Sequence, residues 1–307
     1  GHRMSDPGPR RPSRATFLVR RAIALVAIVG SVALAGWATA AAVRSVGEEE
    51  TAAPTTTAAA VRPRPPKPLR IIFPEGFTRR QMADRIAAVN EIAREKRNVR
   101  PRLSPREYLR LTARHPLPGR FAGDGRRRSL EGFLFPATYE FLARTTTKQL
   151  VTRQLEAFQR NWDRVDLRYA RSKNLTPYDV LIIASMVEKE TAAAAERPLV
   201  AAVIYNRLRI DMPLYIDATI RYGLNVPPTE SLRQSHLRHP TPYNTRVHQG
   251  LPPTPIANPG LASIRAAARP AKVDYLYFVR KPDKVHHFFT ASEREFLRYL
   301  AEHGYGG

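Results

Sequence analysis

The chain has 307 residues, a formal net charge of +23 and no cysteine. That length fits one large or two ordinary domains, and the lack of cysteine excludes disulfides and thiolate metal sites. The charge suits an anionic partner, such as phospholipid head groups, an anionic wall polymer or nucleic acid. Nucleic acid is disfavoured because basic and aromatic residues do not interleave along any run, as they do in proteins that follow a nucleic-acid strand.

An uncharged run at residues 22–43 is the first organised segment, and five arginines between positions 10 and 21 precede it. As a helix it is just long enough to span a bilayer core of about 30 Å. The positive-inside rule predicts residues 1–21 in the cytoplasm and everything after the span outside. A cleaved signal peptide is the alternative, since Ala38-Thr39-Ala40 has the small-x-small form. The long apolar run and long basic lead favour a retained, single-pass anchor in the cell membrane.

A disordered linker and a small module are predicted next. Residues 44–68 are rich in Thr, Ala and Pro and cannot build a core. Residues 69–116 contain a strand at 69–73 followed by two helices. Thr78, with Gln three residues later, predicts the start of the first helix, and Ser104 predicts the start of the second.

The basic, glycine-containing loop at 119–128 predicts a boundary, and residues 129–307 are predicted to form one larger domain. Its helices and short strands lack regular βαβ alternation, so we predict the α+β class. The predicted elements are helices near 146–162, 177–191 and 197–209, a helix started by Asn258 and Pro259, a hairpin from 275–279 and 286–289, and a last helix capped by Ser292.

The helix beginning at Pro177 carries a carboxylate at the end of a run that is apolar on every side. Thr176 and Asp179 cap its start, and residues 180–187 predict a buried helix. Its last turn would place Glu188 where solvation is poor, so the carboxyl would retain its proton better than one in water. The alternative is that Glu188 lies just past the core and reaches solvent.

A second glutamate follows two residues later. Glu188 and Glu190 are about 200° apart around a helix, so they cannot both face one cleft. One is predicted to be a working group and the other a structural or solvated partner. Their spacing does not decide which is which.

Three other titratable residues are weaker candidates. Asp217 follows a short apolar stretch, and it fits either a helix N-cap or a second carboxylate of a site. His286 and His287 are adjacent on a predicted strand and would point to opposite faces, which makes them a poor metal pair.

A proline-dense loop at 241–260 is predicted to be ordered. Long ordered loops in compact domains are usually functional. Tyr243 and Asn244 would offer a flat ring and an amide to a sugar. The alternative is a rigid cover over the core.

Six ordered motifs across about 70–300 resemble the YceG-like (MltG-type) endolytic murein transglycosylases. The motifs are Leu130-Glu131-Gly132 with Pro136-Ala137-Thr138-Tyr139, Val187-Glu188-Lys189-Glu190-Thr191, Asn206-Arg207-Leu208, Tyr243-Asn244-Thr245, Gly250-Leu251-Pro252-Pro253, and Asn258-Pro259-Gly260 with Tyr275-Leu276-Tyr277-Phe278-Val279.

The resemblance gives the catalytic role to the first Glu of the VEKE segment, which is Glu188. It also implies a LysM-like character for the module at 69–116. Less directly, it implies a substrate-binding cleft that contains Glu131, Asn206, Asp217, Tyr243 and Asn244.

The sequence also departs from the family pattern at three positions. Tyr215 stands where relatives usually have Gln, Thr254 where Gly is usual, and Arg246 where an aromatic residue is frequent. The Tyr215 departure touches the expected cleft most directly, so it changes the expected substrate contacts rather than the chemistry.

The implied activity is lytic cleavage between MurNAc and GlcNAc within peptidoglycan strands, leaving 1,6-anhydro-MurNAc ends and setting strand length. No metal or cofactor is implied. Partners would be the glycan strands, with peptidoglycan synthases or division proteins as candidate protein partners and no nucleic acid. The alternatives are a muramidase with Asp217 as second carboxylate and a non-catalytic wall-binding or division scaffold.

Overall fold

The computed structural model describes residues 67–124 and 127–305. The predicted anchor at 22–43 and nearly all of the predicted linker at 44–68 lie outside these residues. In the described ranges, no helix is both long and apolar enough to cross a membrane.

The first elements form a β-α-α-β unit. Strands β1 and β4 pair antiparallel, with Leu69 opposite Phe141, and α2 packs on α3, which packs on α4. The sheet is therefore completed by residues beyond the predicted boundary at 119–128. The elements are β1 (Leu69–Ile72), α2 (Arg79–Arg97), α3 (Pro105–Ala113), β4 (Thr138–Phe141) and α4 (Thr147–Trp162).

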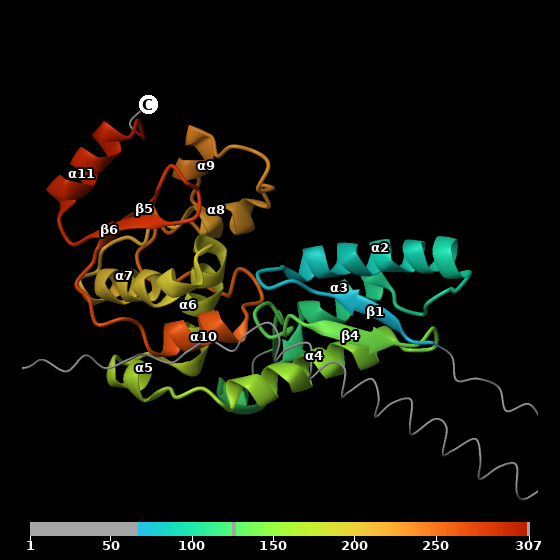
Figure 1. Ribbon diagram of the computed structural model, residues 1–307. Coiled ribbons are helices and arrows are strands. Elements are labelled where there is room, and N and C mark those ends of the chain that lie inside the picture. The colour runs from blue at the N-terminus through green and yellow to red at the C-terminus, as the bar shows by residue number, and fades with distance from the viewer. Residues whose placement is uncertain (1–66, 125–126, 306–307) are drawn as a thin grey trace, which may run out of the picture. The chain divides into compact units, whose positions relative to one another are not determined.

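Three mutually packed helices, α6, α7 and α10, form the centre of the larger part (Figure 1). Residues 180–187 of α6 are all buried, because this helix has neighbours on every side. The central elements are α5 (Arg168–Ser172), α6 (Pro177–Glu190), η2 (Ala194–Glu196), α7 (Arg197–Arg209) and α10 (Leu261–Ala268).

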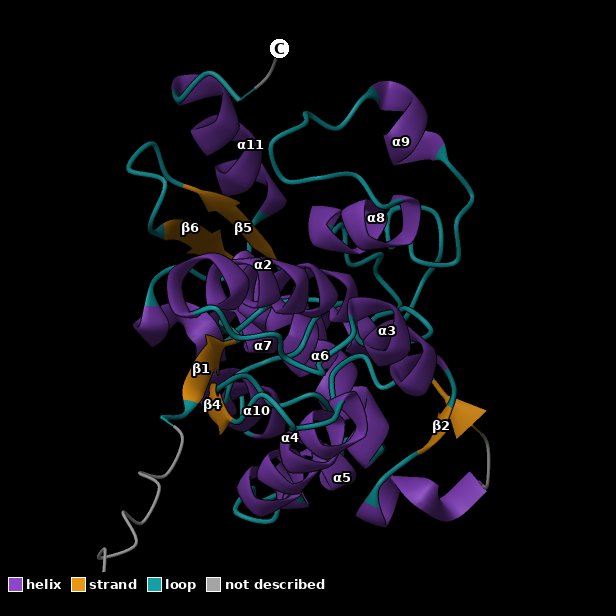
Figure 2. Ribbon diagram, turned by 90° about the vertical axis from the view of Figure 1, so that its right-hand side faces the viewer, coloured by secondary structure: helices purple, strands orange, loops and turns teal. Residues whose placement is uncertain are grey.

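A hairpin and two short helices border this centre. Strands β5 and β6 pair antiparallel, and α11 packs against both of them (Figure 2). Helix α8 contacts both α6 and α9. The remaining elements are α8 (Asp217–Leu224), α9 (Gln234–Arg238), β5 (Tyr277–Arg280), β6 (His287–Thr290), α11 (Glu293–Glu302), and the short β2 (His115–Pro116), η1 (Gly119–Asp124) and β3 (Arg127–Arg128).

The predicted α+β class is confirmed, but two details differ. The prediction that Asn258 starts a helix is wrong. Helix α10 begins at Leu261, because the Asn258 side chain instead hydrogen-bonds Gly132, Leu134 and Glu131. The prediction of a hairpin is confirmed, and both of its strands end one residue later than expected.

Candidate active site

Helix α6 ends in two glutamates that face different neighbours. Its start follows the prediction: Thr176 and Asp179 form a capping box, and Pro177 occupies the first turn. Burial of the helix body fixes the position of its last turn. The directions of Glu188 and Glu190 therefore follow from helix geometry.

Glu188 lies in an enclosed place, with a side chain that is 6% exposed. Its Oε2 accepts a hydrogen bond of 2.9 Å from the Gly260 amide at the start of α10. Its Oε1 lies 3.9 Å from Nη2 of Arg197, whose own side chain is held by Ser263. The turn at Gly76 packs against the Glu188 side chain, and Lys189 donates to the Gly76 carbonyl. The carboxylate is thus held by fixed partners.

A second carboxylate, Glu75, approaches the same place from the turn after β1. A Cβ at Gly260 would meet the Glu75 carboxylate directly. Burial raises the pKa of Glu75, the negative charge of Glu188 raises it further, and Arg197 opposes both. The sequence analysis missed Glu75, because its proximity to Glu188 arises only when the β1–α2 turn meets the start of α10.

Glu190 points toward the start of α8. It interacts electrostatically with Asp217 and Arg280, and the Ala218 backbone amide hydrogen-bonds to it. Burial raises the pKa of Glu190 to about 7, and the charge of Asp217 adds to the shift. A half-buried carboxyl of this kind can hold and release a proton near neutral pH.

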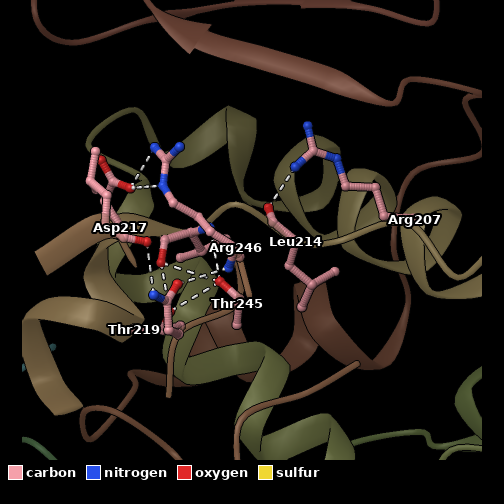
Figure 3. A network of polar contacts seen from close by, with 9 residues as sticks. Arg207, Leu214, Asp217, Thr219, Thr245 and Arg246 are labelled. Atoms are coloured by element: carbon pink, nitrogen blue, oxygen red, sulfur yellow. Dashed lines mark hydrogen bonds and ion pairs between the residues drawn. The ribbon is translucent and has the colours of Figure 1, made fainter. Parts of the chain in front are cut away.

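Asp217 occupies the first turn of α8, and the prediction that it is an N-cap is wrong. The N-cap is Ile216, and the Asp217 carboxylate instead accepts two hydrogen bonds from Arg246, of 3.0 and 2.8 Å (Figure 3). The Asp217 side chain is 48% exposed. Asp217 is therefore an accessible carboxylate near Glu190 that already has a cationic partner.

Glu131 is buried, 1% exposed, and fully engaged within the protein. It accepts hydrogen bonds from the Arg79 amide at the start of α2, from Asn258 and from the Tyr222 hydroxyl. Burial raises the pKa of Glu131 to about 7, against these hydrogen bonds and the charge of Arg79. Its position joins α2, α8 and the loop before α10, which suits a scaffold role.

The predicted amide ligands are also engaged with the backbone. Asn244 is fully buried and donates to the carbonyls of Leu237 and His239. Asn206 donates to the carbonyls of Val273 and Tyr275. It borders a surface pocket of about 650 Å³ that neither glutamate of α6 lines.

Two positions that depart from the family pattern contact each other. The Arg246 guanidinium lies 5.4 Å from the Tyr215 ring centroid, and Tyr215 is 47% exposed with a left-handed backbone, φ 51°. At the third departure, Thr254, the hydroxyl lies 2.8 Å from that of Tyr243. Among the residues that the structure covers, no group of three or more His, Asp or Glu is arranged to hold a metal ion.

Comparisons with known proteins agree with the motifs. The sequence profile of the YceG-like family matches residues 48–302. An endolytic murein transglycosylase of Streptococcus pneumoniae R6 is 33% identical over 257 residues, which are 78% of this chain and 46% of that protein. One from Bacillus subtilis is 34% identical over 174 residues, covering 57% of this chain and 46% of that protein.

A crystal structure of a yceG-like protein from Listeria monocytogenes has a TM-score of 0.61 and 29% sequence identity, and the match covers 75% of each chain. The chain spans somewhat less than half the length of the curated relatives that it matches. The family profile covers most of the sequence described above. The chain belongs to the YceG-like family.

Proposed function

We propose that this chain is a peptidoglycan lytic transglycosylase that cuts within glycan strands, with Glu190 as its acid and base. The observation that carries the proposal is the half-buried Glu190 carboxyl, with a pKa raised to about 7, beside Asp217 at the end of α6. Relatives named endolytic murein transglycosylases support the substrate class.

The proposed reaction uses one carboxyl group twice. Protonated Glu190 gives its proton to the glycosidic oxygen between MurNAc and GlcNAc, and the bond to the MurNAc C1 breaks. The C6 hydroxyl of the same MurNAc then attacks C1, while the Glu190 carboxylate takes the hydroxyl proton. The products are a 1,6-anhydro end and a free GlcNAc hydroxyl, and no water is consumed.

The resemblance gave this role to Glu188, whereas the geometry favours Glu190. Glu188 is held by the Gly260 amide, lies 3.9 Å from Arg197 and packs against the turn at Gly76. Glu190 lies beside the more exposed Asp217. We therefore propose that Glu188 holds the end of α6 in place.

A muramidase is the second candidate function. The observation in its favour is the electrostatic interaction between Asp217 and Glu190, because hydrolysis requires a second carboxylate to activate water or form a covalent intermediate. Against it, Arg246 occupies the Asp217 carboxylate with two hydrogen bonds.

Mass spectrometry of strand ends after digestion of purified glycan tests the proposal. We expect 1,6-anhydro ends, which are lighter by one water than the reducing ends that a hydrolase leaves. Reducing ends would assign the muramidase reaction. An intact substrate under conditions that keep the chain folded would favour a non-catalytic wall-binding role.

We further propose that residues 22–43 anchor the chain in the cell membrane with residues 45–307 outside. The uncharged run and the arginines before it support this arrangement. Protease treatment of intact spheroplasts should degrade the part after the span and protect a tag at the N-terminus. Release of a soluble chain beginning near Ala41 would instead indicate a signal peptide.

A further inference from the structure

Three arginines gather around the Glu190 site. Arg246 bonds Asp217, Arg280 interacts with Glu190, and Arg207 contacts the ring of Tyr215 from the α7 side. Figure 3 shows Arg246 reaching Asp217 at one end of the segment 214–217 and Arg207 reaching Leu214 at the other.

Arg207 is a buried cation held by backbone carbonyls. It is 5% exposed, and its hydrogen bonds go to the backbone carbonyls of Leu276 and Leu214, at 2.6 and 2.5 Å. Burial lowers its pKa to about 10, so it stays charged at neutral pH. No carboxylate in the described ranges forms an ion pair with it. It therefore supplies a fixed positive charge beneath Tyr215 and Tyr277, whose ring centroids lie 5.9 and 5.8 Å away.

Arg246 and Tyr215 form the accessible surface above this charge. The two bonds from Arg246 reach a single oxygen of Asp217, so the pair leaves the second carboxylate oxygen outside this contact. The Arg246 side chain is 32% exposed and Tyr215 is 47% exposed. The Nη1 group of Arg246, which these two bonds do not use, can donate to a carboxylate from solution, and the ring beside it offers a flat apolar face.

The charges around the site do not balance. Three guanidinium groups, those of Arg207, Arg246 and Arg280, lie among these residues, against two carboxyl groups, those of Asp217 and Glu190. The excess is positive. Such a field attracts an anionic substrate group.

We propose that Tyr215 and Arg246 form a subsite for a carboxylate carried by the 3-O substituent of MurNAc, with Arg207 supplying fixed charge beneath it. This inference rests on the proposed function and names the part of the substrate that the site would recognise. The carboxylate has two possible sources, the free lactyl group of a stripped strand or the peptide attached to it.

The test compares strands that differ only in charge. Peptide-bearing strands and strands stripped to the lactyl group are each prepared with free carboxylates or with the carboxylates converted to methylamides. The full chain in detergent should cleave the free form at least about tenfold faster by kcat/KM in one of the two pairs, since a charge-assisted hydrogen bond is lost in the amide. The pair that shows the preference identifies the source of the carboxylate.

Arg246→Gln should abolish this preference, and Arg246→Lys should restore part of it. The matched control is Arg233→Gln, which removes an exposed arginine from an ion pair of 3.4 Å with Glu230. Arg233→Gln should keep the preference of the wild type.

Equal rates on free and amidated strands in both pairs would overturn the subsite while leaving the proposed function standing. A uniform loss on every strand in Arg246→Gln would also overturn it, because Arg246 would then act only on Asp217. If no strand is cleaved, the proposed function fails. Binding to Glu190→Gln then decides the subsite: free-carboxylate strands should bind about tenfold tighter, and equal binding would overturn it.

Discussion

The two glutamates at the end of α6 have the same side chain and different surroundings. Glu188 is 6% exposed and held by the Gly260 amide and Arg197. Glu190 lies two residues further along, beside Asp217, with its pKa raised to about 7. The difference arises because two residues turn a helix by about 200°, so each side chain meets a different set of elements.

A buried helix fixes the directions of its terminal side chains, while the elements that pack on each side decide the chemistry of those side chains. The α10 start and the β1–α2 turn enclose Glu188. The α8 start and Arg280 at the end of β5 are the neighbours of Glu190, and burial there raises its pKa to about 7.

The largest expected effect comes from removing the titratable group of Glu190. Glu190→Gln should lower the rate of glycan cleavage by about 10²–10⁴-fold, because the amide cannot act as acid or base. Initial rates on purified strands give the measurement, and an unchanged circular dichroism spectrum is the control for folding. Activity within a few-fold of the wild type would remove Glu190 from the reaction.

The scaffold beneath both glutamates is tested by Gly132→Ala. Gly132 has φ 90°, and a Cβ there would lie 2.7 Å from Pro255 and 3.2 Å from Leu181 of α6. We expect a loss of about 2–4 kcal/mol in the free energy of unfolding, measured with urea. Gly250→Ala is the matched control, since Gly250 has φ 82° and open space around it, so it adds only backbone strain. Equal losses in the two variants would argue against a tight contact between Gly132 and α6.

The pH dependence should separate the wild type from Glu190→Gln. The pKa of Glu190 is about 7 in the fold against an ordinary value of 4.5, so the folded state binds more protons between these values. The contribution of Glu190 to the free energy of unfolding is fully present below about pH 4.5 and is lost as the pH rises to about 7. The wild type should therefore lose on the order of 1–2 kcal/mol relative to Glu190→Gln across that window, a value reduced by solvent screening.

Urea titrations at several pH values measure this difference in the free energy of unfolding. Glu131 also has a raised pKa, but it is present in both proteins, so its contribution cancels. Cleavage by the wild type should also decline above about pH 7, as the catalytic proton is lost. A difference in stability that does not change with pH would contradict the raised pKa of Glu190.

The smallest effect is expected on the enclosed side, for Gly260→Ala. The added Cβ would displace the Glu75 carboxylate, which is the end of an exposed and flexible side chain. Gly260 has an ordinary φ of −74°, so no backbone strain is added. We expect a loss below about 1 kcal/mol, measured as a small shift in Tm. A much larger loss would mean that Glu75 is a fixed part of the Glu188 cluster.

Local signals in the sequence predicted most helices well. The capping box of α6, the run of α7 and the Ser292 cap of α11 are set by residues within one turn of each other, so they can be read from the chain. Long-range contacts could not be read in this way. Asn258 was expected to start a helix, but its side chain is engaged by Gly132 and Leu134, more than a hundred residues away in the chain.

The candidate site was predictable only in part. The sequence identified the pair of glutamates and their divergence, but not which one is enclosed. That depends on Glu75 and Gly260 meeting Glu188, and on α8 meeting Glu190. The side chains of Asn206 and Asn244 were expected in the substrate cleft. In the structure they donate to backbone carbonyls, contacts that spacing along the chain does not reveal.

The most direct test of the difference between the two glutamates is the rate of 1,6-anhydro end formation by Glu188→Gln and Glu190→Gln, measured side by side on the same strands. Both changes keep the shape of the side chain, so the comparison isolates the titratable proton. We predict that Glu188→Gln stays within about tenfold of the wild type, while Glu190→Gln loses at least about 100-fold. The reverse result would return the catalytic role to Glu188 and contradict the account.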